Sequence, residues 1–342
     1  MKVDRYNNSP LASLAYLVVL IAGLKAGSSL IIPLLMAFFW FLIFLPLVNK
    51  LRSFGLPDLL TTLIVFGITL IIVMVVGTFL ITSGQDLVSN LPAYQEKFYE
   101  VTPKVVSFFE KFGISLQKSD AINLLDPAKI INFTALFLKG MGDIMTNGFL
   151  TLIVVMFLFL ESSLLSNKLL YLTKKEGTKE KVQLFLDKVN IYFLTKTITS
   201  AVTGLVVWGM LSFFKLDYAL LFGLLAFFLN YIPNIGSAIA ALPALIMALL
   251  QLSLIETAII AAGYILINTL IGNLIEPKVM GKGMGLSILV VFISMVFWGW
   301  MFGPVGMFLS VPLTVVIKIA CDNSKELQWV SVVLSDDVPQ NR

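Results

Sequence analysis

The feature of this chain that most constrains its fold is an apolar run too long and too broken for one membrane-crossing helix. Residues 218–250 read YALLFGLLAFFLNYIPNIGSAIAALPALIMALL, and as one helix they would be about 50 Å long against a hydrocarbon core of about 30 Å. Pro233 and Gly236 divide the run into halves of about 22 Å, each too short to cross. The pattern predicts a re-entrant hairpin, with a single tilted, proline-kinked helix as the alternative.

A second run has the same length and the same interruption. Residues 286–318 are also largely apolar, and Gly-Pro-Val-Gly at 303–306 breaks them centrally. A plain span precedes each broken run, so that 197–250 and 255–318 look alike. If both runs are hairpins, Lys278 and Lys282 lie in the cytoplasm, as the positive-inside rule prefers, whereas eight plain spans would place them outside. We therefore expect an inverted repeat, as in many secondary transporters.

The composition agrees with a membrane protein. Hydrophobic residues make up 58% of the chain and charged residues 13%, against about 25% charged in soluble domains. Further apolar runs cover about 11–28, 29–48, 59–82 and 147–165. The predicted fold class is an all-α polytopic membrane protein with about eight hydrophobic segments. Lysines beside the span ends place both termini in the cytoplasm.

These features divide the chain into five parts. The predicted parts are three scaffold spans (1–83), an extracytoplasmic amphipathic helical segment (84–146), a fourth span with a cytoplasmic amphipathic helix (147–196), an inverted-repeat transport domain (197–320) and a cytoplasmic tail (321–342).

Several function classes lack the residues that they need. The chain has no histidine and one cysteine, Cys321, which excludes histidine-based zinc sites, Ser-His-Asp catalysis and an intrachain disulfide. No GxxxxGK[ST] nucleotide motif occurs. The net charge of +4 is small and lies in loops, so it indicates orientation and not nucleic-acid binding. We expect no metal, no cofactor and no enzymatic activity.

The two breaks are the predicted substrate site. Non-helical backbone at membrane depth survives only inside protein or beside a water-filled cavity, and a half-helix start offers free amides to polar atoms. Carboxamides and aromatic faces near the breaks suit a small, hydroxyl-rich solute. The candidate substrate-binding residues are Asn230, Pro233, Asn234, Gly236, Ser237, Asn268, Asn273, Trp298, Trp300, Gly303 and Pro304.

One carboxylate is a candidate for ion coupling. Asn268, Gly272 and Glu276 recur every four residues and would share one helix face. A carboxylate near membrane depth is a functional candidate by default. The alternative is a structural pair of Glu276 with Lys278 or Lys282 at the helix end. Glu276 and Lys278 are the predicted coupling residues.

Three motifs together resemble a known family. NYIPNIGS (230–237), GNLIEPKVMGKGMGLS (272–287) and FWGWMFGPVGMFLSVPLT (297–314) occur in the order and spacing of the autoinducer-2 exporter family, and the resemblance extends over essentially the whole chain. It implies export of small solutes across the bacterial inner membrane, and a homopentamer in which each protomer carries its own route. Some members of the family are described as sodium(lithium)/proton antiporters.

The leading hypothesis is export of autoinducer-2 or a similar polar molecule, with the lipid bilayer and a homo-oligomer as partners. Cation/proton antiport is the alternative, and it would need a titrating carboxylate such as Glu276. A structural or pore-forming oligomer stays open, because repeats and breaks also build channels.

Overall fold

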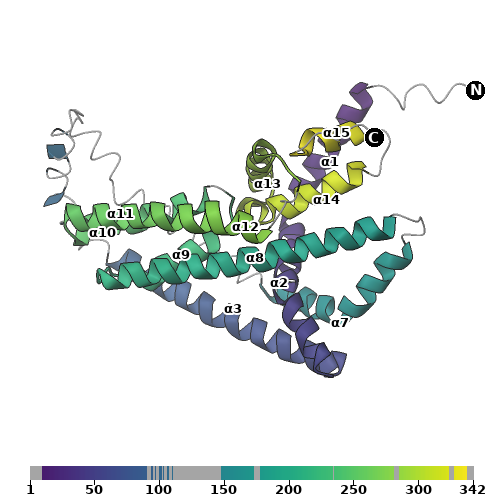
Figure 1. Ribbon diagram of the computed structural model, residues 1–342, viewed down its shortest axis with the longest axis horizontal. Coiled ribbons are helices and arrows are strands. Elements are labelled where there is room, and N and C mark those ends of the chain that lie inside the picture. The colour runs from purple at the N-terminus through teal and green to yellow at the C-terminus, as the bar shows by residue number, and fades with distance from the viewer. Residues whose placement is uncertain are drawn as a thin grey trace, which may run out of the picture.

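A computed structural model describes residues 10–90, 148–172, 178–233, 235–280, 285–322 and 327–336, and separate positions between 94 and 110. All its elements in these ranges are helices (Figure 1). Five helical segments of the described chain are long and apolar enough to cross a membrane, and shorter apolar helices accompany them. The all-α polytopic fold class is therefore confirmed.

Four helices form the first part of the fold: α1 (Pro10–Ala26), α2 (Ser28–Ser53), α3 (Asp58–Ser89) and α7 (Gly148–Leu172). Each predicted span matches one of these helices, although 11–28 runs two residues past the end of α1, and α2, α3 and α7 continue past the predicted ends at 48, 82 and 165. α2 packs on both α3 and α7. The short turn from α2 to α3 uses Gly55 at φ +84°, a backbone conformation that glycine adopts without a steric penalty.

Helix α8 (Thr178–Phe213) is one continuous element of 36 residues. The predicted boundary at residue 196, between the cytoplasmic amphipathic helix and the next span, falls inside this helix. Lys196 at this boundary is buried, and the helix passes through the position without interruption.

The rest of the chain forms two broken pairs of helices and a long connection between them. The elements are α9 (Ala219–Leu229), α10 (Gly236–Gln251), α11 (Leu254–Ile267), a π-helix η1 (Asn268–Ile275), α12 (Glu276–Met280), α13 (Ile288–Phe308), α14 (Ser310–Asp322) and α15 (Gln328–Leu334). A capping box fixes the start of α11, where Ser253 and Glu256 exchange hydrogen bonds.

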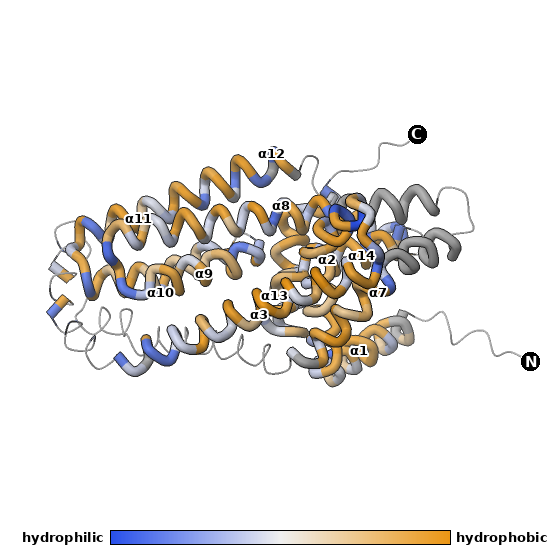
Figure 2. The backbone as a smooth tube through the Cα atoms, turned by 90° about the horizontal axis from the view of Figure 1, so that it is seen from below, coloured by the Kyte–Doolittle hydropathy of each residue, from blue (hydrophilic) through white to orange (hydrophobic). Residues whose placement is uncertain are grey.

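The core lies where the two parts of the fold meet. Phe39 of α2 contacts Phe193 of α8 and Tyr231 beyond α9, with ring centroids 5.9 and 5.3 Å apart. Figure 2 shows apolar residues along most of these helices, and hydrophilic ones at the far ends of α3, α10 and α11. The predicted segment 84–146 lies mostly outside the described residues.

Candidate functional site

The first broken run closes on itself as a hairpin. The Gln251 side chain at the end of α10 donates to Asp217, just before α9, at 2.7 Å, and the Asp217 amide donates back to it at 2.9 Å. A kinked membrane-crossing helix would hold these two residues far apart. The re-entrant hairpin is therefore the correct interpretation of 218–250. We call this unit hairpin 1.

The open end of hairpin 1, at Asp217 and Gln251, also binds the segment after α3. Tyr94 donates its hydroxyl to the Asp217 carboxylate at 3.0 Å and accepts from Gln251 at 3.2 Å. Burial and the neighbouring Asp217 raise the pKa of the Tyr94 hydroxyl. The hydroxyl therefore keeps its proton, and this hydrogen bond, through neutral and alkaline pH.

The second broken run closes in the same way. Lys318 of α14 donates to the Gly285 carbonyl before α13, and the Ser287 amide donates to Leu334 of α15 at 3.2 Å. Within α13, Gly303 leaves helical geometry at φ +65° and ψ −148°. We call residues 285–318 hairpin 2. The open ends of the two hairpins lie toward opposite ends of the molecule (Figure 1), as an inverted repeat requires.

Each hairpin turn contains a glycine at a position where an added Cβ would have no space. A Cβ at Gly236 would lie 1.7 Å from the Leu229 carbonyl oxygen, and one at Gly306 would lie 1.9 Å from that of Trp298. In both turns the residue four positions earlier, Ile232 or Phe302, approaches the same point at 3.1 Å. The two turns thus share one packing arrangement, although their sequences are only loosely alike.

The two hairpin tips meet at the centre of the molecule. The ring of Tyr231 in hairpin 1 lies 6.4 Å from that of Phe308 in hairpin 2, and Phe39 contacts both. The tips therefore place both interruptions of regular backbone beside each other and against the first part of the fold.

A lysine from outside the hairpin binds the free carbonyl groups of each break. Lys196 donates to the Asn230 carbonyl at 3.0 Å. Lys25 of α1 donates to the carbonyls of Trp300 and Met301, the latter at 3.2 Å, and its ammonium lies 5.2 Å from the Trp300 ring centre. Pro304 has no amide to give the Trp300 carbonyl, so Lys25 supplies the missing donor.

Glu276, which is largely buried, forms an ion pair with the buried Lys196 at 2.7 Å. The alternative considered from the sequence was a pair with Lys278 or Lys282. Lys278 is exposed on α12, and Lys282 lies outside the described residues. Because Lys196 also binds Asn230, the ion pair connects α8, α12 and the tip of hairpin 1.

The five polar residues among the predicted substrate-binding residues divide into three groups. Asn230 is buried and donates to Ser200 at 3.0 Å, and Ser237 donates to Asn268 at 2.7 Å, so these polar groups do gather around hairpin 1. Asn273 is exposed on the π-helix η1. Asn234 lies outside the described residues.

The two tryptophans of hairpin 2 have different surroundings. Trp298 is buried and donates to Thr314 at 3.0 Å, so its polar atom is already occupied within the hairpin. Trp300 is exposed beneath Lys25. Neither indole faces the ion pair.

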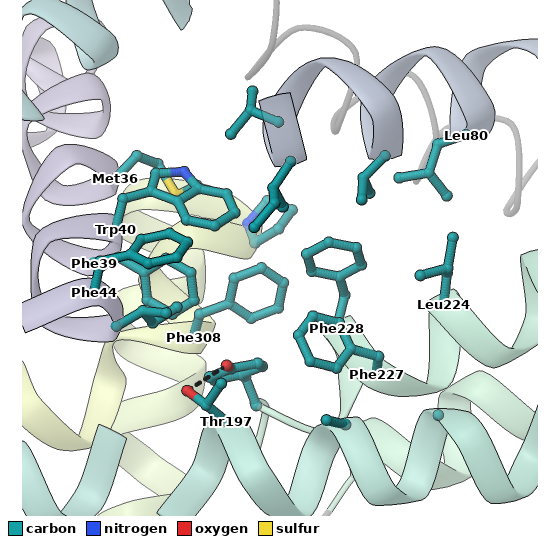
Figure 3. Close-up of a pocket in the computed structure, with 18 of the residues that line it drawn as sticks. Met36, Phe39, Trp40, Phe44, Leu80, Thr197, Leu224, Phe227, Phe228 and Phe308 are labelled. Atoms are coloured by element: carbon teal, nitrogen blue, oxygen red, sulfur yellow. Dashed lines mark hydrogen bonds between the residues drawn. The ribbon is translucent and has the colours of Figure 1, made fainter. Parts of the chain in front are cut away.

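A large cavity lies on the other side of Tyr231. Its volume is about 520 Å³. Aromatic and aliphatic side chains of α2, α3, α8, α9 and hairpin 2 line it. They include Phe39, Trp40, Phe227 and Phe308 (Figure 3). Two polar groups at its wall bind each other, since the Tyr231 hydroxyl donates to Thr197 at 2.9 Å. The cavity therefore suits an apolar occupant, and of the predicted residues only Pro304 lines it.

Sequence reasoning missed Lys25, Lys196 and Ser200. Lys25 could have been noticed as a charge inside the first apolar run, and Lys196 as a charge at the centre of a longer helix. Their partners are 275 and 80 residues away in the chain, so no local pattern identifies them.

Replacing Lys25 with methionine should destabilise hairpin 2. The change keeps an unbranched side chain but leaves the Trp300 and Met301 carbonyls without this donor, and a net hydrogen bond contributes about 0.5–1.5 kcal/mol. We expect a lower melting temperature in detergent. Lys50→Met at the exposed end of α2 is the control, and equal melting temperatures for the two variants would contradict the role of Lys25.

Comparison with known proteins gives one consistent result. The profile of a family described as AI-2E family transporter matches residues 14–326. The AI-2 transport protein TqsA of Escherichia coli K12 is 36% identical over 94% of both chains. A transport protein of Haemophilus influenzae is 33% identical over 95% of this chain and 96% of its own. YhhT of Escherichia coli K12 is 32% identical over 99% and 97%. The names of the last two specify no substrate.

Proposed function

The chain belongs to the AI-2E family of transporters, and we propose on this basis that it exports a small polar solute from the bacterial cytoplasm. Autoinducer-2 is the leading substrate, since the relative TqsA is named for AI-2 transport. The observation that supports this proposal most directly is the meeting of the two hairpin tips, Tyr231 against Phe308.

The physical reason is the cost of broken backbone in a membrane. Free carbonyl and amide groups need polar partners at that depth, and here buried Lys196, Asn230 and Ser200 supply them beside the tip of hairpin 1. The same groups can exchange hydrogen bonds with the hydroxyls of a passing solute. Helices that line a path only with hydrocarbon would offer such a solute nothing.

The architecture suggests a division of labour. We infer that residues 197–320 form the transport domain and residues 1–83 the scaffold, with both termini in the cytoplasm and the protein in the inner membrane. The resemblance to the exporter family adds a homopentamer. Chemical cross-linking in native membranes tests the oligomeric state, since the largest cross-linked band on a gel gives the number of subunits. A series of bands that ends at the dimer would overturn the pentamer.

Transport in proteoliposomes tests the substrate. Vesicles that contain the purified chain should move labelled autoinducer-2 faster than protein-free vesicles, and a proton gradient should change the rate. Sodium or lithium added to the same vesicles, with a pH-sensitive dye inside, tests cation/proton antiport. Proton movement driven by sodium or lithium, without autoinducer-2 transport, would replace the proposed function with antiport.

A further inference from the structure

Helix α8 has two opposite faces with different chemistry. Thr197, Ala201, Gly204, Leu205 and Trp208 line the apolar cavity. The hydroxyl of Thr197 is fully engaged, because it donates to the Phe193 carbonyl at 2.7 Å and accepts from Tyr231. The cavity face therefore leaves a polar solute no free hydroxyl on α8.

The other face carries a polar stripe. Tyr192, Lys196, Ser200 and Thr203 follow each other at intervals of three or four residues and so share one side of the helix. All four are buried. A stripe of this kind in a membrane-embedded helix needs polar partners along its whole length.

The stripe faces α11, η1 and α12, which pack along α8. Two contacts fix an antiparallel register. Lys196 pairs with Glu276 at 2.7 Å, and Met210 packs so closely on Gly263 that a Cβ there would lie 2.3 Å from its sulfur. Tyr264, the residue after Gly263, is also buried.

Three buried hydroxyls on α8 and α11 have no hydrogen-bond partner among the described residues: those of Tyr192, Thr203 and Tyr264. The three side chains are only 4%, 4% and 6% exposed. A buried polar group without a partner costs about 1–3 kcal/mol, and such groups in native proteins usually bind water or a ligand. Hydrocarbon lipid can offer neither.

We propose that these residues form a hydrated binding track for an uncharged, hydroxyl-rich solute. The track consists of Tyr192, Lys196, Ser200 and Thr203 on α8, with Tyr264 and Glu276 opposite. The binding of a solute in this track rests on the proposed function, whereas the presence of water in the track does not.

The charges and the geometry decide the class of solute. Lys196 and Glu276 neutralise each other, so the track offers no net charge to an ion, while the hydroxyls and the ion pair offer donors and acceptors to a polyol. Asn230 connects the track to the tip of hairpin 1, through its carbonyl to Lys196 and its amide to Ser200. A solute at the tip thus has continuous hydrogen-bonding groups along α8.

Cysteine labelling tests the hydration without any substrate. In a Cys321→Ala background, Thr203→Cys should react with a small water-soluble methanethiosulfonate on the order of ten-fold faster than Thr69→Cys, because only a hydrated thiol ionises readily. Thr69 of α3 is the matched control, since it is also buried but its hydroxyl donates to the Val65 carbonyl at 2.8 Å and so needs no water. Equal rates at the two positions would overturn the track.

Stability and export of hydroxyl-deleted variants test the solute. Thr203→Val and Tyr264→Phe remove unpartnered hydroxyls, so each should melt no lower than the parent protein, while autoinducer-2 export falls at least about five-fold if a solute hydrogen bond worth about 1 kcal/mol is lost. Thr69→Val, at a buried threonine whose hydroxyl already binds the Val65 carbonyl, should leave export unchanged. Wild-type export by folded Thr203→Val and Tyr264→Phe would exclude solute binding in the track. If the parent protein moves no autoinducer-2, the proposed substrate fails and the labelling result still stands.

Discussion

Alanine at Gly236 or Gly306 should abolish transport and destabilise the protein by more than about 3 kcal/mol, the upper range for added atoms in a packed core. The new Cβ would lie 1.7 or 1.9 Å from a backbone carbonyl oxygen, and a backbone group cannot move aside as a flexible side chain can. Because each glycine sits inside a hairpin tip, the tip must open to make room. Yield of folded protein on size-exclusion chromatography and vesicle export measure the two effects.

Gly209→Ala on α8 is the control for both glycines. No atom lies within 4 Å of a Cβ at this position, and alanine favours a helix over glycine by about 1 kcal/mol. This variant should fold and export like the parent. Folded, active Gly236→Ala would show that hairpin 1 does not turn as tightly as its backbone indicates, and the same holds for Gly306→Ala and hairpin 2.

The sequence allowed the hairpins to be predicted because length and local chemistry define them. A run of 33 residues with Pro233 and Gly236 at its centre is inconsistent with a simple span, and charge placement favoured the hairpin over the kinked helix. The closing contact between Asp217 and Gln251 is the structural counterpart of that argument. Local rules were sufficient here because a hairpin is a local structure.

The contents of the site were harder to predict because they depend on contacts between distant parts of the chain. In the sequence, Lys196 looks like the other lysines beside span ends. Only the packing of α12 on α8 shows that its side chain is buried. The π-helix η1 also has no clear signal in Asn268–Ile275. The sequence alone therefore did not show which residues from distant parts of the chain contact one another.

The positions of the cavity and the track give the hairpin tip two different sides. Tyr231 lies at the wall of the apolar cavity, whereas the preceding Asn230 binds Lys196 and Ser200. Two adjacent residues thus face an apolar cavity and a set of hydrogen-bonding groups. Movement of hairpin 1 away from α8 would break the hydrogen bonds of Asn230 to Lys196 and Ser200.

Neutralising one partner of the Lys196–Glu276 pair should cost about 3–5 kcal/mol, because the other charge is left buried and uncompensated. We therefore expect Lys196→Met and Glu276→Gln each to give little folded protein. The double variant removes both charges, and replacing a buried pair by neutral groups is often tolerated. It should recover most of the lost stability, as a melting curve in detergent would show. Strictly additive losses in the double variant would contradict direct pairing.

The folded double variant then separates a structural pair from a coupling pair. If the pair only fixes α12 to α8, the double variant should export autoinducer-2 with the parent's response to a proton gradient. If a proton must reach Glu276 before Lys196 can release Asn230, export should persist at a low rate that no longer depends on the gradient. We expect the second result, since the ammonium of Lys196 binds the carboxylate and the hairpin tip at once. Lys278→Met, which alters an exposed lysine two residues from Glu276, is the matched control and should keep the gradient response. A double variant that responds to the gradient as this control does would remove Glu276 from the coupling mechanism.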